Sequence, residues 1–171
     1  FRSLLPFPKQ SGEDHDQGDA FLHRLERVLD LYADPDEIDA KGEIPDMLLS
    51  ELARIGAFGI KIPVRYGGLG LSQTNYSRAA MLLGSRCGNL AALLSAHQSI
   101  GAPQPLILFG TEEQKKRMLP PMAAGKVKTC FGVTEPNTGL NTTKLKTRAV
   151  RQGDKYVVHG QKVWISTRSE E

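Results

Sequence analysis

The sequence has 171 residues, 40% hydrophobic and 24% charged, which suits one domain or one domain plus part of a second and excludes general disorder. Its longest uncharged stretch, residues 87–111, is broken by polar residues and prolines, which excludes a good transmembrane helix. Two cysteines exclude a disulfide framework or a zinc site, and a net charge of +3 is too small to indicate nucleic-acid binding.

The positive charge lies near the C-terminal end. Residues 126–171 hold nine basic and four acidic side chains, whereas residues 1–125 hold 13 basic and 15 acidic ones. A solvated sheet surface would explain this asymmetry, and so would a site for an anionic cofactor or substrate. Charge alone favours the solvated surface.

Helical signals dominate the first part of the chain. Residues 1–15 contain two prolines and many polar residues, and predict an irregular arm. Apolar residues at steps of three and four then predict an amphipathic helix over residues 19–32, which Asp34-Pro35 should end. A second helix should begin at Pro45-Asp46, with Gly56 as its C-terminal cap.

A glycine-rich segment and a capped helix follow. Residues 59–70 hold four glycines and a proline, which predicts a tight loop where backbone approaches backbone. The spacing is not that of a phosphate-binding loop, since neither GxxxxGK[ST] nor GxGxxG is present. Ser72 can cap a helix that runs to about Arg86.

Two more helical segments complete this part. Residues 90–100 are apolar nearly all round, which predicts a helix buried between others and interrupted at Pro103 and Pro105. Thr111 and Gln114 have the spacing of a capping box. The Pro120-Pro121 pair is expected to bend or break the helix that begins there.

After residue 125 the hydrophobic period changes to two. The expected strands are residues 129–133, 144–150, 155–158 and 161–166, with turns at Gly153 and Gly160. Short antiparallel strands of this kind indicate the beginning of a β-sandwich or barrel. The predicted fold class is therefore α+β, with an irregular arm (1–15), an all-helical domain (16–125) and the first strands of a β domain (126–171).

Two segments could carry chemistry. The sequence has neither GxSxG nor HExxH, and no metal site is predicted, because Asp14-His15-Asp16 is better explained as solvated charge. The loop over residues 134–141 is rich in Thr, Asn and Gly and can present several backbone N–H groups to an anion. Trp164 and Ser166 share one face of their predicted strand, which suits a planar cofactor. Physical reasoning alone favours a core tryptophan and a surface serine instead.

A set of motifs resembles the acyl-CoA dehydrogenase family. In chain order they are Ile62-Pro-Val-Arg-Tyr-Gly-Gly-Leu-Gly70, Phe109-Gly-Thr-Glu-Glu-Gln-Lys-Lys-Arg-Met-Leu-Pro120, Phe131-Gly-Val-Thr-Glu-Pro with Gly139, and Tyr156-Val-Val-His-Gly-Gln-Lys-Val-Trp-Ile-Ser166. Each motif alone is weak, but the ordered set spans about residues 16–167 and is specific.

The resemblance implies a flavoenzyme of fatty-acid β-oxidation. Such an enzyme binds FAD between its middle β domain and a C-terminal four-helix domain, which is absent from this sequence. It oxidises an acyl-CoA thioester to the trans-2-enoyl-CoA and passes electrons to an electron-transferring flavoprotein, usually as a homo-oligomer (dimer or tetramer). The family's catalytic glutamate lies in the C-terminal domain. The resemblance therefore implies no catalytic residue here, a fragment that is inactive alone, and a structural role for Glu135.

The resemblance also implies the cofactor-binding residues. The Val133 backbone and the Thr134 side chain would hold the pyrimidine edge of the flavin, Gly139 would let backbone approach the pyrophosphate, and the Ser166 hydroxyl would face flavin N5. Leu140-Asn141 stands where the family usually has Ser-Asp, so only the Leu140 backbone N–H remains for that contact. The full set is Phe131, Gly132, Val133, Thr134, Gly139, Leu140, Trp164, Ile165 and Ser166, of which Phe131 and Leu140 would also contact the substrate.

Other interpretations remain open. An acyl-CoA oxidase shares the fold but passes its electrons to oxygen, and a truncated, non-catalytic interaction module is a third alternative. The compartments that fit are the mitochondrial matrix and the bacterial cytoplasm, or the peroxisome for an oxidase.

Overall fold

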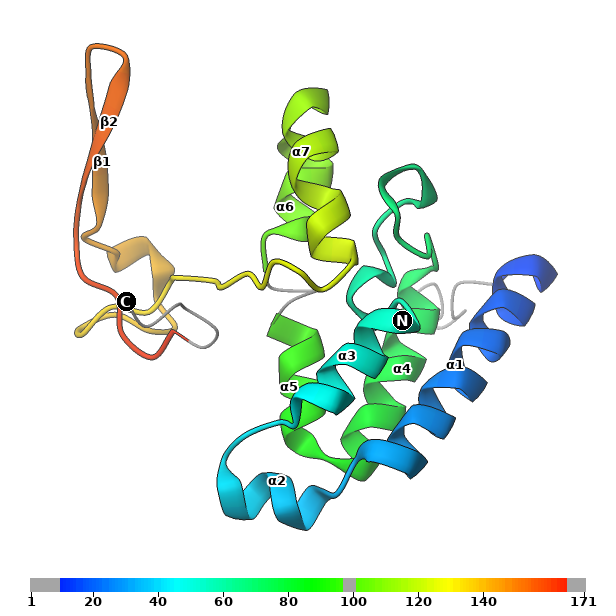
Figure 1. Ribbon diagram of the computed structural model, residues 1–171. Helices are drawn as coiled ribbons and strands as arrows, with labels where there is room; N and C mark the ends of the chain where they lie inside the picture. The colour runs from blue at the N-terminus through cyan, green and yellow to red at the C-terminus, as the bar shows by residue number, and fades with distance from the viewer. Residues whose placement is uncertain (1–9, 97–100, 166–171) are drawn as a thin grey trace, which may run out of the picture.

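The computed structural model describes residues 10–96 and 101–165. Helices come first and a β-hairpin follows, as expected for the predicted α+β class (Figure 1). The helices are α1 (Gly12–Tyr32), α2 (Pro35–Lys41), α3 (Asp46–Arg54), α4 (Gln73–Arg86), α5 (Gly88–Ser95), α6 (Pro103–Phe109) and α7 (Glu112–Ala123). The 3-10 turns are η2 (Ala57–Gly59), η3 (Val64–Tyr66) and η5 (Thr142–Lys144), and the strands are β1 (Arg148–Gln152) and β2 (Lys155–His159).

The larger core lies among α1, α3, α4 and α5. Helix α1 packs against α3 and α4, and α4 packs against α5 (Figure 1). Their apolar stripes meet in one cluster, whose fully buried members include Phe21, Leu25, Leu48, Leu83 and Leu90. This burial is the main stabilising contribution to the helical domain.

A smaller core joins α7 to the glycine-rich loop. Ile62 and Tyr66 from that loop pack against Leu119 and Met122 of α7, and α6 also packs against α7. The loop is tight because a Cβ at Gly68 would lie 2.0 Å from the Ile62 carbonyl oxygen. A glycine is therefore required there, which confirms the predicted close approach of backbone to backbone.

Local capping signals predicted helix ends well. The Ser72 hydroxyl accepts from the Asn75 N–H at 3.3 Å at the start of α4, and Thr111 and Gln114 form the predicted capping box of α7. Gly56 follows α3 with a φ of 85°. These signals depend only on neighbouring residues.

Helix α1 begins earlier than the sequence predicted. Ser11 caps it, its hydroxyl accepting from the Asp14 N–H at 3.2 Å, so residues 12–15 belong to the helix and not to an irregular arm.

Helix α2, directly after α1, was not predicted from the sequence. Asp34-Pro35 does end the first helix, but Asp34 also caps α2, because a proline fits the first turn of a helix.

The proline pair of α7 does not break the helix, which continues to Ala123. Leu119 and Met122 are fully buried beside the pair, and Ala124 N–H still donates to the Pro120 carbonyl at 3.0 Å.

Helix α5 is less buried than expected, since Leu90 and Leu94 are buried but Ala92 is exposed. The end of that predicted helix, residues 97–100, lies outside the described residues.

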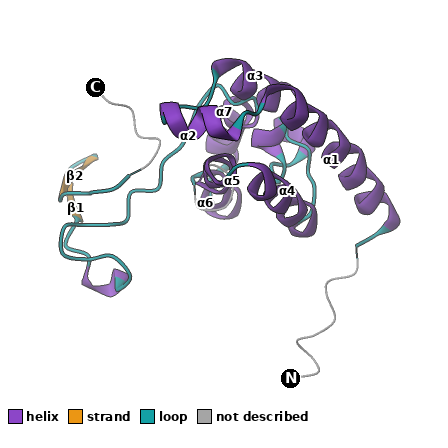
Figure 2. Cartoon of the chain, turned by 90° about the horizontal axis from the view of Figure 1, so that it is seen from below, coloured by secondary structure: helices purple, strands orange, loops and turns teal. Residues whose placement is uncertain are grey.

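Two of the four predicted strands form. β1 and β2 pair antiparallel, with Val150 opposite Val157, around a turn at Gly153. Residues 129–133 and 161–165 form no ladder in the described structure. One backbone hydrogen bond links the two regions, from Val163 N–H to the carbonyl of Thr134, the residue after the first segment, at 3.0 Å. The hairpin stands apart from the helices (Figures 1 and 2).

Candidate functional site

Three chain segments meet around the Glu135 carboxylate. The backbone N–H groups of Lys146 and Thr147 donate to Oε2 and Oε1 at 2.8 and 2.9 Å, and Lys162 Nζ lies 3.0 Å from Oε1. Glu135 is buried although it is charged. A buried carboxylate needs such partners, so this arrangement holds the loop, the start of the hairpin and residue 162 together.

Glu135 is held in its ionised form. The nearby Thr147 side chain, the N–H groups of Lys146 and Thr147 and the Lys162 ammonium lower the pKa of Glu135 from 4.5 to about 2. The Thr147 hydroxyl lies among these groups without a hydrogen bond of ordinary geometry. Since donors already surround the carboxylate and its pKa is low, Glu135 is unsuited to act as a general base near neutral pH. The structural role expected from the sequence agrees with this geometry.

The loop after Glu135 is closed by its own backbone. Glu135 and Thr138 exchange hydrogen bonds, with N···O distances of 2.8 and 3.1 Å, and the Thr138 hydroxyl donates to the Lys144 carbonyl at 3.3 Å. Nothing within 4 Å would meet a Cβ at Gly139, and its φ is not positive. Neither a packing contact nor a positive φ therefore requires a glycine at residue 139, and the space beside it is open to a ligand.

Lys162, Val163, Trp164 and Ile165 line an open pocket of about 410 Å³. The side chain of Trp164 is 89% exposed, and its φ of 58° is rare for a bulky residue. An exposed tryptophan in a strained backbone is unexpected for a core position. The sequence-based preference for a core tryptophan is therefore wrong for this structure.

The other predicted site residues differ in exposure, and one of them lies outside the described chain. Phe131 and Leu140 are exposed, at 51% and 104%. Val133 and Thr134 are half-buried and are joined to residues 162 and 163 by hydrogen bonds. Ser166, expected to carry a hydroxyl for the cofactor, lies beyond the described residues.

Lys162 is the functional candidate that sequence reasoning missed. Its ammonium donates to the Val133 carbonyl at 2.9 Å as well as to Glu135. Its strand-like alternation with Trp164 was visible in the sequence, but a partner 27 residues away was not. Within the described chain, the Thr134 N–H and the Thr134 hydroxyl donate a hydrogen bond to no group. The site can therefore offer free donors and an exposed flat ring to a planar heterocycle.

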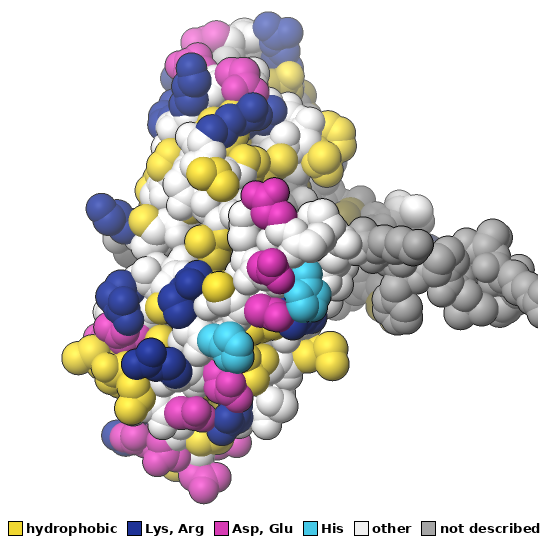
Figure 3. Space-filling model, turned by 90° about the vertical axis from the view of Figure 1, so that its right-hand side faces the viewer, with side chains coloured by type: hydrophobic (Ala, Val, Ile, Leu, Met, Phe, Trp, Pro, Cys, Tyr) yellow, Lys and Arg dark blue, Asp and Glu magenta, His cyan; other side chains and the backbone are white. Residues whose placement is uncertain are grey.

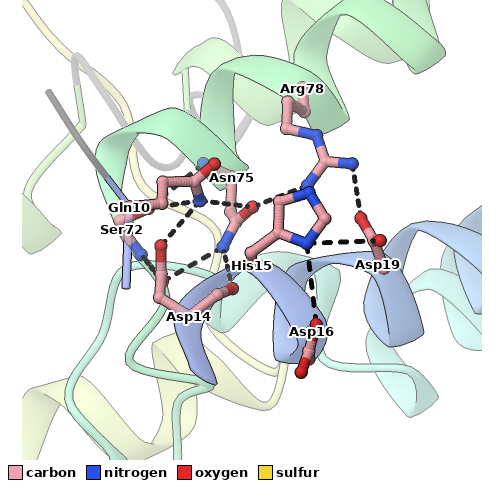
Figure 4. A network of polar contacts seen from close by, with 8 residues as sticks. All are labelled: Gln10, Asp14, His15, Asp16, Asp19, Ser72, Asn75 and Arg78. Atoms are coloured by element: carbon pink, nitrogen blue, oxygen red, sulfur yellow. Dashed lines mark hydrogen bonds and ion pairs between the residues drawn. The ribbon is translucent and has the colours of Figure 1, made fainter. Parts of the chain in front are cut away.

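A second polar cluster lies between α1 and α4 (Figure 4). Asn75 is fully buried and donates through Nδ2 to the Asp14 carbonyl at 2.7 Å, while Arg78 pairs with Asp19 at 2.5 Å. An open pocket of about 470 Å³, which includes Leu22 and Met81, adjoins the ion pair, on the face where Figure 3 shows charged and hydrophobic side chains intermixed. The cluster's hydrogen bonds join the two helices, so we assign it a structural role.

Over residues 10–96 and 101–165, no group of three or more His, Cys, Asp or Glu side chains could hold a metal ion. His15 lies 3.5 Å from Asp19 and 3.6 Å from Asp16, but His15 and Asp16 are exposed to solvent and Asp19 is paired with Arg78. None of the helices in these ranges is long and apolar enough to cross a membrane.

Known proteins share both the sequence and the fold. The family described as "Acyl-CoA dehydrogenase, N-terminal domain" matches residues 17–126. The probable acyl-CoA dehydrogenase FadE10 of Mycobacterium tuberculosis is 44% identical over 95% of this chain and 25% of its own length. The very long-chain specific acyl-CoA dehydrogenase of mouse mitochondria is 35% identical over the same shares. The chain thus spans about a quarter of the length of these relatives.

A solved structure gives the same result. The acyl-CoA dehydrogenase of Bacillus anthracis, solved in complex with FAD, is 32% identical and superposes with a TM-score of 0.75 over 92% of this chain and 27% of that one.

Proposed function

This chain belongs to the acyl-CoA dehydrogenase family, and from that premise we propose that it forms the flavin- and thioester-facing part of an enzyme that oxidises an acyl-CoA to the trans-2-enoyl-CoA. The observation that carries the proposal is that two free donors of Thr134, its N–H and its hydroxyl, belong to the segment that is hydrogen-bonded to Lys162 and Val163, the residues just before the exposed Trp164. When bound, FAD would accept the hydride that leaves the substrate β-carbon.

The residues fit a flavin in three respects. The Val133 backbone and the free Thr134 donors suit the hydrogen-bonding edge of its pyrimidine ring. Trp164 offers an exposed ring face for packing. The open space at Gly139 suits close approach of backbone to a pyrophosphate, to which the Leu140 N–H would also donate.

The remaining roles follow from the family. Gly132 and Ile165 would complete the surface against the ring, and Phe131 and Leu140 would contact the thioester substrate. The Ser166 hydroxyl would face flavin N5. The base that removes the α-proton is not proposed among these residues, because Glu135 is occupied by its own donors.

We also propose the protein's partners and location from its relatives. The enzyme would pass electrons to an electron-transferring flavoprotein and would assemble as a homo-oligomer, a dimer or a tetramer. Its compartment would be the mitochondrial matrix or the bacterial cytoplasm, since its relatives come from mouse mitochondria and from bacteria.

The test is an anaerobic titration of the natural-length protein, purified with FAD, with acyl-CoAs of graded chain length. Bleaching of the flavin absorption bands would support the proposal, and the chain length that bleaches them best would define the substrate. Rapid reoxidation by oxygen would identify an oxidase instead. A protein that takes up no FAD would favour a non-catalytic interaction module.

A further inference from the structure

We propose that Lys162 and Glu135 are positioning residues for the peptide group between Val133 and Thr134, and that Lys162 makes the Thr134 N–H a stronger hydrogen-bond donor. The inference rests on the proposed function, because the acceptor would be an atom on the pyrimidine edge of the flavin. It adds two side chains that act on the cofactor through the backbone, without touching it.

The contact that matters is the one between Lys162 and the Val133 carbonyl, at 2.9 Å. The Val133 carbonyl and the Thr134 N–H belong to one peptide group. A cation bound at the oxygen withdraws electron density from the group, and hydrogen bonds in such a chain strengthen one another. Since the Thr134 N–H donates to no group in the described part of the chain, the strengthened donor is available to a ligand.

Glu135 fixes the lysine in the position that this requires. Its carboxylate is anchored by the backbone N–H groups of Lys146 and Thr147, and it lies 3.0 Å from Lys162 Nζ. The lysine side chain is 26% exposed and the glutamate side chain 6% exposed, so solvent screens the pair only partly. The long lysine chain is thereby held against the Val133 carbonyl and does not extend into water.

The following residue is held as well. The Val163 N–H donates to the Thr134 carbonyl at 3.0 Å. The carbonyl groups on both sides of the Thr134 N–H are therefore bound to the segment that carries Trp164. This geometry fixes the Thr134 N–H relative to the segment that carries the Trp164 ring. An ion pair that only stabilised the surface would not require that arrangement.

The experiment compares variants of the natural-length protein. Lys162→Met removes the charge and the hydrogen bond, Lys162→Gln keeps a donor but removes the charge, and Lys162→Arg keeps the charge. Lys155→Met, in the exposed part of the hairpin, is the matched control. For each variant one measures the FAD dissociation constant of the apoprotein, the midpoint potential of the bound flavin and the thermal unfolding of the apoprotein.

We expect Lys162→Met to weaken FAD binding about twofold to tenfold, because Lys162 strengthens the Thr134 N–H donor without contacting the cofactor itself. Lys162→Gln should lower the midpoint potential because a weaker donor stabilises the reduced flavin less, and Lys162→Arg should restore most of both properties. Lys155→Met should resemble the wild type.

Wild-type FAD affinity and midpoint potential in Lys162→Gln would overturn the inference, even if the apoprotein unfolded at a lower temperature. Lys162 and Glu135 would then only stabilise the fold, and the proposed function would stand. If Lys162→Met does not fold, the comparison of Lys162→Gln with Lys162→Arg decides the matter. A wild-type protein without FAD would instead overturn the proposed function and the inference with it.

Discussion

Gly18 of α1 faces Asn75 of α4 so closely that a Cβ built on Gly18 would lie 2.1 Å from Asn75 Oδ1. Asn75 is fully buried, and its amide donates to the Asp14 carbonyl and to Asp14 Oδ1, at 2.7 and 3.1 Å (Figure 4). The missing side chain at residue 18 thus makes room for the amide that joins the two helices.

We expect Gly18→Ala to destabilise the protein by about 1–3 kcal/mol, the usual cost of overpacking. Alanine favours a helix by about 1 kcal/mol over glycine, but Asn75 would have to leave its buried hydrogen bonds. Urea unfolding measures the effect. The control is Gly84→Ala in α4, where the nearest atom is Ala91 Cβ at 3.7 Å, and it should raise stability by up to about 1 kcal/mol.

Glu135 predicts a pH dependence for the loop and the start of the hairpin. Its pKa is lowered from 4.5 to about 2 in the folded state, so its stabilising contribution is fully present above pH 4.5 and is lost as the pH falls toward 2. Hydrogen exchange should show protection of the Lys146 and Thr147 amides, relative to their intrinsic rates, that declines over this range. In Glu135→Gln the protection should be low throughout and nearly independent of pH, whereas Glu113→Gln on α7 should retain the wild-type profile.

Gly139→Ala separates a ligand role from a structural one. With nothing within 4 Å of the added Cβ and no positive φ, the apoprotein should keep its unfolding free energy to within about 0.5 kcal/mol. FAD binding should weaken if the pyrophosphate approaches this backbone. Gly153→Ala, at a φ of 65° in the hairpin turn, should show the reverse, a less stable apoprotein with little change in FAD affinity. Equal FAD affinity in Gly139→Ala and wild type would remove Gly139 from the site.

Leu140→Ser should improve FAD binding. The Leu140 side chain is fully exposed, so its replacement should not disturb the apoprotein, and a serine would supply the hydroxyl that the family usually has there. One hydrogen bond contributes about 0.5–1.5 kcal/mol, which corresponds to about a twofold to tenfold gain in FAD affinity. Leu140→Ala removes the same apolar surface without adding a donor, and a gain as large in that variant would mean that the hydroxyl is not responsible.

The sequence predicted what neighbouring residues decide. The caps at Ser72 and Thr111 and the turn at Gly153 depend on short-range hydrogen bonds and backbone conformation, and the structure has all three. Helix α2 was missed because Asp34-Pro35 can both end one helix and begin another, and only packing of the buried Ile38 decides for the second.

Long-range pairing was less predictable. Residues 129–133 and 161–166 have strand periodicity, but a strand needs a neighbour. In the described part of these segments there is no ladder, and the one backbone bond between the two regions joins Val163 to Thr134, just beyond the first segment. The contact between Lys162 and Glu135 spans 27 residues and left no local signal. The expected cofactor residues remain predictions, although the structure brings residues 133 and 134 together with residues 162 and 163.

The exposed ring of Trp164 gives the candidate site an optical reporter. It is the single tryptophan of these 171 residues, and it lines the pocket beside Lys162. The tryptophan fluorescence of these residues therefore originates at the site itself. A flavin packed on the indole would quench that emission by energy transfer, so binding at this surface could be followed without labels, and quenching would be sensitive to where on the protein the ligand sits.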